Sequence, residues 1–195
     1  HAVGGTPSLA VLHGVLEVMP RKPDLVVSGI NYGENVSTDI SYSGTVGAAI
    51  EAASLGIPAL ASSYQVMENE WDSYRDIDFS IAAYFTRFFA ERMLAIKLPP
   101  DVDLLNLSIP QSATKTTAWQ VTRLAAGRYY NPYVKRDGTW DEEGHIHSRI
   151  IVHDHLPEDS DVSVLIKKKM VSVTPISLDM TSRIKLSELE KQLRS

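Results

Sequence analysis

The stretch DLVVSGINYGENVSTDISYSGTVGAAIEAASLGIPALASS, residues 24–63, decides the fold because it joins two apolar runs through a polar loop and a small-residue helix. The β-branched run at 24–29 is typical of a strand covered on both faces. The run at 58–63 predicts a second buried strand. Between them, a helix is predicted to begin near Ser43 and to end at Gly56, a natural C-cap that a proline soon follows.

The alternation of helix and strand continues on both sides of this stretch. A hydroxyl followed by proline at Thr6-Pro7 predicts a helix that reaches about Val18. A long amphipathic helix is predicted at 76–98, and a third strand at 101–110. We therefore predict an α/β fold, with a three-layer, Rossmann-like parallel or mixed sheet and helices on both faces.

The C-terminal part of the chain has a different pattern. Runs rich in β-forming residues flank an Asp137-Gly138 turn and predict a β-hairpin arm. A strand at 170–178 and a short helix at 184–193 follow, and we expect the arm and this helix to serve oligomerisation. The predicted division is a core α/β domain at 1–118, and a segment at 119–195 with the arm, the final strand and the C-terminal helix.

Composition and charge narrow the classes of function. Nucleic-acid polymers and membrane surfaces are disfavoured as partners by the net charge of −5, because both require clustered Lys and Arg. The sequence has no cysteine, which excludes disulfides, thiolate metal sites and cysteine nucleophiles. This composition is consistent with a reducing compartment, and we predict a cytoplasmic protein. No apolar run approaches the ~20 residues that a membrane span needs.

The polar loop before Ser43 is the best candidate for chemistry. Ligands of doubly wound sheets bind beyond the carboxyl ends of the strands, where this loop should lie. The N–H groups of Gly44 and Thr45 should point outward from the helix start and attract an anion. The Ser43 and Thr45 hydroxyls would complete a phosphate cradle, or Ser43 could simply cap the helix. A dinucleotide-binding oxidoreductase is disfavoured because the glycine fingerprint is missing, and a Walker loop is also absent.

Three motifs resemble the SurE survival-protein family of metal-dependent nucleotidases: GTP at 5–7, PDLVVSGINYGEN at 23–35 and YSGTVGAAIEAASLGIPALA at 42–61. Weaker similarities extend the likeness over nearly all of the chain. The resemblance implies a phosphatase that converts nucleoside 5′- or 3′-monophosphates to nucleoside and phosphate, and in some members cleaves polyphosphate. It also implies a divalent cation, Mg²⁺ or Mn²⁺, among hard oxygen ligands.

The resemblance also implies site residues. Asn31 falls on the family's asparagine metal ligand. The implied phosphate-binding positions are Asn31, Ser43, Gly44 and Thr45. Asn35 and Asp39 fall on pocket-lining positions to which the resemblance gives no defined role.

The sequence departs from the family at its start. Family members begin with a strand that ends in an Asp-Asp pair, and a later serine adds a further metal ligand. No Asp-Asp pair occurs here, and the chain starts roughly 70 residues into the expected domain. We therefore expect a fragment with unassigned catalytic residues, and we expect these 195 residues alone to be inactive. A non-catalytic oligomeric or ligand-binding protein that lacks the metal site is the alternative.

Two further clusters leave alternatives open. Two His-x-His pairs could chelate a transition metal or belong to an exposed polar hairpin: His145, His147, His153 and His155. Four aromatic residues could stack on a nucleobase or pack against a partner subunit: Tyr129, Tyr130, Tyr133 and Trp140. The predicted partners are a nucleoside monophosphate substrate and further copies of the chain, in a homodimer or homotetramer.

Overall fold

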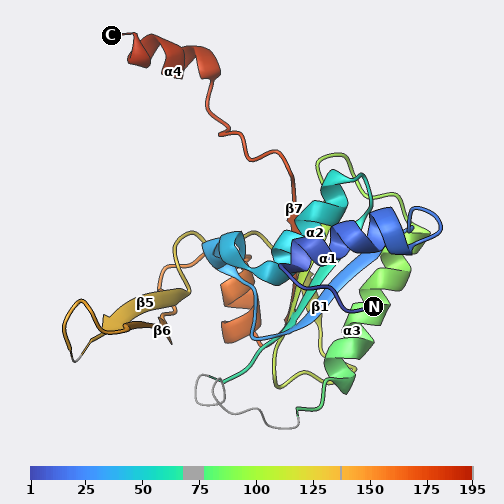
Figure 1. Ribbon diagram of the computed structural model, residues 1–195, viewed down its shortest axis with the longest axis horizontal. Helices are drawn as coiled ribbons and strands as arrows, with labels where there is room; N and C mark the ends of the chain where they lie inside the picture. The colour runs from blue at the N-terminus through green and yellow to red at the C-terminus, as the bar shows by residue number, and fades with distance from the viewer. Residues whose placement is uncertain (68–76, 137, 195) are drawn as a thin grey trace.

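A computed structural model describes residues 1–67, 77–136 and 138–194, and its centre is a five-stranded sheet in the order β1-β2-β3-β7-β4 (Figure 1). The strands are β1 Val26–Tyr32, β2 Ala59–Tyr64, β3 Leu104–Ile109, β4 Trp119–Val121 and β7 Val171–Ile176. β1, β2 and β3 run parallel, β7 runs antiparallel to β3, and β4 runs parallel to β7. The predicted mixed α/β sheet is confirmed.

Helices cover both faces of this sheet (Figure 1). The α-helices are α1 Pro7–His13, α2 Gly44–Ser54, α3 Ser80–Ala95 and α4 Leu186–Leu193, of which α4 stands away from the sheet. In β2, Ala59 and Ala61 pack in the cluster that contains α2, whereas Leu60 packs in the cluster that contains Phe85 and Phe89 of α3. Successive residues of a strand point to opposite faces, so α2 and α3 lie on opposite sides of the sheet. The predicted three-layer arrangement is confirmed.

The helix boundaries differ slightly from those predicted. The first helix is α-helical to His13 and continues as a π-helical turn over Gly14–Val18. The predicted start of the long helix at Asp76 lies outside the described residues, and α3 ends at Ala95 because Ile96 adopts an extended backbone. None of the helices in the described ranges combines the length and apolar composition of a bilayer-crossing helix.

The predicted hairpin arm forms a second, two-stranded sheet that extends from the body (Figure 1). It consists of antiparallel β5 Tyr130–Lys135 and β6 His145–Ile150. Asp137 of the predicted turn lies outside the described residues. Strands β4 and β7 also come from the sequence after residue 118, and they complete the central sheet. The sheet therefore draws strands from both segments of the predicted division.

β1 is less buried than predicted. None of its residues is fully buried, whereas all six residues of β2 are. The reason is its place at the edge of the described sheet, where β2 is its hydrogen-bonded neighbour. The prediction of a strand covered on both faces is thus right for β2 and wrong for β1.

A close approach at Gly29 lies at an irregularity in the pairing of β1 with β2. The φ angle of Gly29 is +125°, and a Cβ added there would lie 2.3 Å from the carbonyl oxygen of Ser62. The β1–β2 pairing shifts register between Ser28 and Asn31, so that Asn31 pairs with Ser63. Such irregularities re-aim the side chains that follow them. Gly29 therefore sets the position of Asn31.

We expect Gly29→Ala to destabilise the protein by about 3 kcal/mol, because the substitution combines an unfavourable backbone conformation with a clash against main chain. Urea unfolding measures the change. Gly14→Ala is the matched control, since Gly14 is helical and has no atom within 4 Å of an added Cβ. Equal stabilities of the two variants would contradict this account of Gly29.

Candidate functional site

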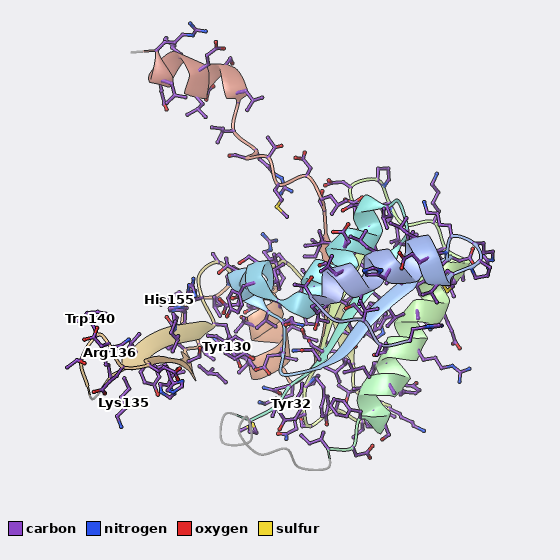
Figure 2. The ribbon with its side chains drawn as sticks, in the orientation of Figure 1. Tyr32, Tyr130, Lys135, Arg136, Trp140 and His155 are labelled. Atoms are coloured by element: carbon purple, nitrogen blue, oxygen red, sulfur yellow. The ribbon has the colours of Figure 1, made fainter. Side chains whose placement is uncertain are left out.

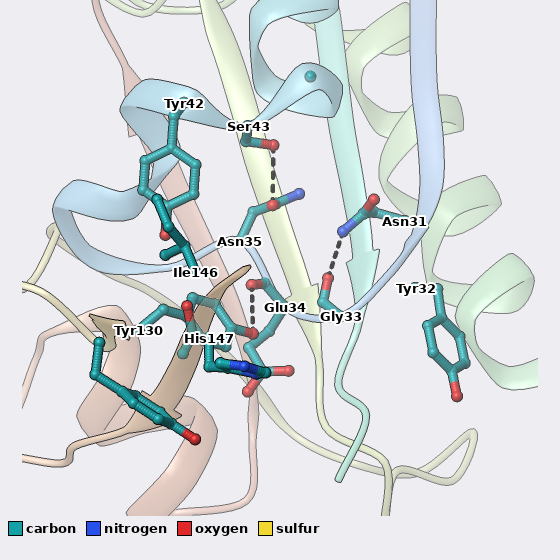
Figure 3. A pocket seen from close by; sticks show the side chains of 13 residues that line it. Asn31, Tyr32, Gly33, Glu34, Asn35, Tyr42, Ser43, Tyr130, Ile146 and His147 are labelled. Carbon is teal, nitrogen blue, oxygen red and sulfur yellow. Dashed lines mark hydrogen bonds between the residues drawn. The ribbon is translucent and has the colours of Figure 1, made fainter. Parts of the chain in front are cut away.

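A cavity of about 730 Å³ lies between the loop after β1, the start of α2 and the arm (Figure 3). Its walls include Asn31, Asn35, Ser43 and Gly44 on one side, and Tyr133 and His147 of the arm on the other. The cavity is at the carboxyl end of β1, where ligands of α/β sheets bind. The structure thus brings four of the predicted site residues to one cavity.

The start of α2 has the features of an anion site. The Ser43 hydroxyl accepts the Val46 N–H at 3.2 Å, so Ser43 is the N-cap. The Gly47 N–H donates to the Ser43 carbonyl at 2.9 Å. Across the described part of the chain, the backbone N–H groups of Gly44 and Thr45 have no acceptor. Unpaired N–H groups at the positive end of a helix dipole attract negative charge.

Close packing against α1 supports this helix start. A Cβ added at Gly44 would lie 3.1 Å from Pro7 Cγ, tighter than an ordinary contact. The Thr6 hydroxyl in turn accepts the Leu9 N–H at 3.3 Å and caps α1. The Thr6-Pro7 motif therefore packs against the start of α2, and glycine at position 44 allows the two helices to meet.

Hydrogen bonds from two strands fix the main chain of Asn35. Its N–H donates to Ser63 Oγ of β2 at 3.1 Å. Its carbonyl accepts from Asn106 Nδ2 at 2.8 Å and from Ser108 Oγ at 2.9 Å, both in β3. These three partners are buried. The sheet thus holds the middle of the polar loop in one place.

The side chain of Asn35 has one paired and one unpaired end. Its Oδ1 accepts the Ser43 hydroxyl at 2.9 Å. Its Nδ2 is buried and has no partner in the described ranges. A buried donor without an acceptor costs about 1–3 kcal/mol, so the arrangement calls for an explanation. Figure 3 shows this nitrogen turned away from Ser43, toward the side where Asn31 lies.

Asn31 presents an oxygen at the same cavity. Its Nδ2 donates to the Gly33 carbonyl at 2.7 Å, which fixes the direction of the amide and leaves Oδ1 for a ligand. Magnesium needs about six oxygen ligands, and Asn31 supplies one. Within the described ranges, no group of three or more His, Cys, Asp or Glu residues is placed to hold a metal ion. The described residues therefore do not form a complete metal site.

Glu34 connects the loop to the arm instead of offering a free carboxylate. Its carboxylate accepts the Tyr129 hydroxyl at 2.6 Å and the Val66 N–H at 3.3 Å. The Tyr130 hydroxyl donates to the Glu34 carbonyl at 3.1 Å. Burial raises the pKa of the Glu34 carboxyl, and burial beside Glu34 also raises the pKa of Tyr130. Sequence reasoning assigned Glu34 no role.

Asp39 lies apart from the cavity lining, although the resemblance implied a pocket position for it. It is buried, and its Oδ2 accepts the N–H groups of Tyr129 at 2.8 Å and Tyr130 at 2.7 Å. Both bonds lie at the base of the arm. Asp39 therefore fixes the arm on the loop by accepting from its main chain.

Asp161 fixes the other end of the same loop and was not singled out from the sequence. Its carboxylate accepts the N–H groups of Ser37 at 2.7 Å, Ala125 at 2.9 Å and Val162 at 2.8 Å. Ser37 is held at a φ of +58°, a conformation that non-glycine residues rarely adopt. Burial raises the pKa of Asp161, and the three N–H donors oppose that shift.

The aromatic residues and histidines singled out from the sequence lie in different parts of the arm and its base. Tyr133 stacks on His147 with ring centroids 5.4 Å apart, and both line the cavity. Tyr129 is buried at the base of the arm. Trp140 is 90% exposed and lies beside Arg136 at the far end of the arm (Figure 2). Of the four histidines of the two pairs, His147 is the one that lines the cavity.

Comparisons with known proteins find similar sequences over nearly the whole chain. The sequence profile described as "Survival protein SurE" matches residues 1–131. The 5′-nucleotidase SurE of Methanosarcina acetivorans is 40% identical over 199 residues, which cover 99% of this chain and 74% of that protein. The 5′-nucleotidase SurE of Methanocaldococcus jannaschii is 40% identical over 190 residues, covering 93% and 68% of the two chains.

A solved structure is similar in fold. The crystal structure of the SurE protein from Aquifex aeolicus superposes with a TM-score of 0.75 at 32% sequence identity. The match covers 98% of this chain and 74% of that chain. At this identity and coverage, the shared fold extends over the loop, the start of α2 and the arm.

The raised pKa of Glu34 predicts a pH dependence of stability. The folded protein holds this proton more tightly than the unfolded chain does, so stability should fall as pH rises from about 4.5 through the folded-state pKa. Glu34→Gln removes the titration. The stability of the wild type relative to this variant should therefore decline with rising pH, as measured by urea unfolding between pH 4 and 8.

Asp161 titrates in both proteins, so its contribution cancels in this difference. Glu91→Gln is the control, because Glu91 is an exposed residue paired with Arg87 on α3. If the difference in unfolding free energy between the wild type and Glu34→Gln does not change with pH, Glu34 does not titrate as described.

Proposed function

The chain belongs to the SurE family, and on that premise we propose that its cavity binds the phosphate of a nucleoside monophosphate and that the protein hydrolyses this monoester. The observation that carries the proposal is the pair of unpaired N–H groups on Gly44 and Thr45, at a helix start beside the cavity. Relatives named 5′-nucleotidase SurE support the reaction class.

A cytoplasmic location remains part of the proposal, and cell fractionation tests it.

The nucleoside would lie on the arm side of the cavity. Tyr133 and His147 offer stacked aromatic rings there, and aromatic faces accept any base. This arrangement favours the nucleobase-stacking interpretation for Tyr133, while buried Tyr129 packs inside the protein. Because stacking is tolerant of base identity, we propose that the site accepts several nucleobases. Action on both 5′- and 3′-monophosphates, and on polyphosphate, is part of the proposal on the ground of the family resemblance.

The roles of the chain's own residues are binding and orientation. The N–H groups of Gly44 and Thr45 would hold phosphoryl oxygens and stabilise the charge that develops on them during transfer. A divalent cation such as Mg²⁺ or Mn²⁺ would supply Lewis acidity, and Asn31 Oδ1 is the oxygen that this chain would offer it. Because the described residues provide one such ligand, no step of the reaction is assigned to the cation.

One observation favours a second candidate function. The buried acids beside the polar loop, Glu34, Asp39 and Asp161, are all engaged by N–H or O–H donors. None of these three carboxylates is therefore free to act as a general base on an attacking water. A protein that binds nucleotides without hydrolysing them is consistent with this arrangement.

An assay of phosphate release distinguishes hydrolysis of a nucleotide from nucleotide binding without hydrolysis. When this chain is joined to the family's Asp-Asp segment, we expect phosphate release from a nucleoside monophosphate with Mn²⁺ present, and we expect Asn31→Ala to lower that turnover by more than about 100-fold while the fold persists. Residues 1–195 alone should not turn over. Asn131→Ala, an asparagine outside the cavity, is the control. Phosphate binding without turnover would support the binding function, and absence of both would refute the proposed site. Normal turnover in Asn31→Ala would remove the metal assignment.

We also propose that α4 joins copies of the chain in a homodimer or homotetramer. α4 stands away from the body of the molecule (Figure 1), and none of its residues is buried. Leu186, Leu189 and Leu193 lie on one face of this helix and are exposed. A helix with an exposed apolar face gains stability when another surface covers that face.

Light scattering coupled to gel filtration tests this proposal. Replacing Leu186, Leu189 and Leu193 by Glu should convert the oligomer to a smaller species, because three charges would enter the apolar contact. The control combines Ser187→Glu with Lys191→Glu, which makes the same net change of −3 on the opposite face. If both variants keep the wild-type mass, α4 does not hold the copies together.

A further inference from the structure

The two faces of the arm differ in chemistry. Residues that pair directly across two antiparallel strands point to the same face, and so do alternate residues along each strand. One face of the arm therefore carries the pairs Asn131 with Arg149, Tyr133 with His147, and Lys135 with His145. The other face carries Tyr130 with Ile150, Pro132 with Ser148, and Val134 with Ile146. We call the first of these the cationic face.

Two unpaired positive charges lie on the cationic face. Lys135 and Arg149 are both exposed, and neither forms an ion pair with another residue of the described ranges. None of the six residues of this face is Asp or Glu. The whole chain has a net charge of −5, so the cationic face differs in sign from the protein that carries it. Such a local cluster attracts anions.

The cationic face continues from the cavity along the arm. Its central pair, Tyr133 and His147, stacks with ring centroids 5.4 Å apart and lines the cavity. Lys135 is two residues from Tyr133, about 7 Å along the strand, and lies toward the far end of the arm (Figure 2). Arg149 is two residues from His147, on the side of the arm's base. One cation therefore lies on each side of the aromatic pair.

A nucleoside monophosphate does not account for these two cations. Its one phosphate would bind at the start of α2, and its base would lie on the aromatic pair. Phosphates alternate with bases in a single strand of nucleic acid, and proteins that bind such strands combine aromatic rings with positive charges. An inorganic phosphate chain would meet the cations, but it has no base to stack on the rings. The arrangement therefore favours nucleotides over phosphate alone.

We propose that the cationic face of the arm binds the nucleotides that follow a terminal phosphate, so that short single-stranded oligonucleotides with a terminal phosphate are ligands of this protein. The proposal rests on the proposed function, because the terminal phosphate occupies the same cavity. Lys135 and Arg149 contact internal phosphates, and the pair of Tyr133 and His147 stacks a base. Two cations suit a short strand, whereas the net charge of −5 disfavours a long polymer.

Fluorescence anisotropy with a single-stranded DNA trinucleotide tests the role of the cations. The probe has a 5′-phosphate and a fluorophore at its 3′ end. We expect the variant with both Lys135→Ala and Arg149→Ala to bind the probe roughly 10-fold more weakly and to bind AMP as the wild type does. Each phosphate contact contributes about 0.7 to the slope of log affinity against log salt concentration, so this variant should lose about 1.4 of that slope.

The matched control combines Arg87→Ala on α3 with Lys97→Ala just beyond that helix, which removes the same charge away from the arm. Circular dichroism checks that all variants are folded. An equal loss of probe affinity in the control would show that net charge alone governs binding, and the proposal would then be wrong. Unchanged probe affinity in the arm variant would also overturn it.

Two comparisons distinguish an oligonucleotide from a simple phosphate chain. The same trinucleotide without its 5′-phosphate should bind at least about 10-fold more weakly, because nothing then occupies the helix start. Tyr133→Ala should weaken binding of the phosphorylated probe roughly 10-fold, since a stacked base contributes about 1–3 kcal/mol. Its affinity for inorganic tripolyphosphate should not change. If Tyr133→Ala affects neither ligand and tripolyphosphate displaces the probe, the face binds a phosphate chain and the proposal is wrong.

The wild-type titrations keep two failures apart. If the wild type binds neither inorganic phosphate nor AMP, the proposed function fails, and this inference fails with it. If the wild type binds AMP but binds the phosphorylated trinucleotide no more tightly than AMP, the proposed function stands and the inference about the arm is wrong.

Discussion

The candidate site depends on buried carboxylates that accept main-chain N–H groups. Asp161 binds the Ser37 N–H, and Asp39 binds the N–H groups of Tyr129 and Tyr130. A loop this polar can be buried only if its donors find acceptors, since an unpaired buried group costs as much as a lost hydrogen bond. A carboxylate satisfies several donors at once. Two aspartates can therefore fix a loop whose regular structure is the short 3₁₀-helix Ser37–Tyr42.

This use of the acids determines which groups remain for a ligand. Glu34, Asp39 and Asp161 are engaged by the protein itself, so the cavity is left with uncharged donors and acceptors from Asn31, Asn35 and the start of α2. Such a wall offers N–H donors to an anion, because neutral N–H groups attract negative charge. The three carboxylates hold the loop in place, and the amide groups at the cavity are the ones left to bind a ligand.

The elements predicted from local pattern were confirmed, and the features missed depend on contacts between distant residues. The strands at Val26–Tyr32 and Ala59–Tyr64 and the helix start at Gly44 follow from apolar runs, a capping serine and glycine. The reversed direction of β7 and the roles of Glu34 and Asp161 have no local signature. The bond from Tyr129 to Glu34 spans 95 residues and that from Ser37 to Asp161 spans 124, so neither leaves a pattern of spacing.

Buried hydrogen bonds join the arm to the polar loop, so a movement of the arm should also move the loop. Asp39 binds the base of the arm at the Tyr129 and Tyr130 N–H groups, and the Glu34 carboxylate binds the Tyr129 hydroxyl. The same loop contains Asn35, whose Oδ1 accepts from the Ser43 cap of α2. The two walls of the cavity are thus joined through buried hydrogen bonds that close packing makes stiff. A displacement of the arm should therefore change the donor geometry at the start of α2, even though no arm residue belongs to that helix.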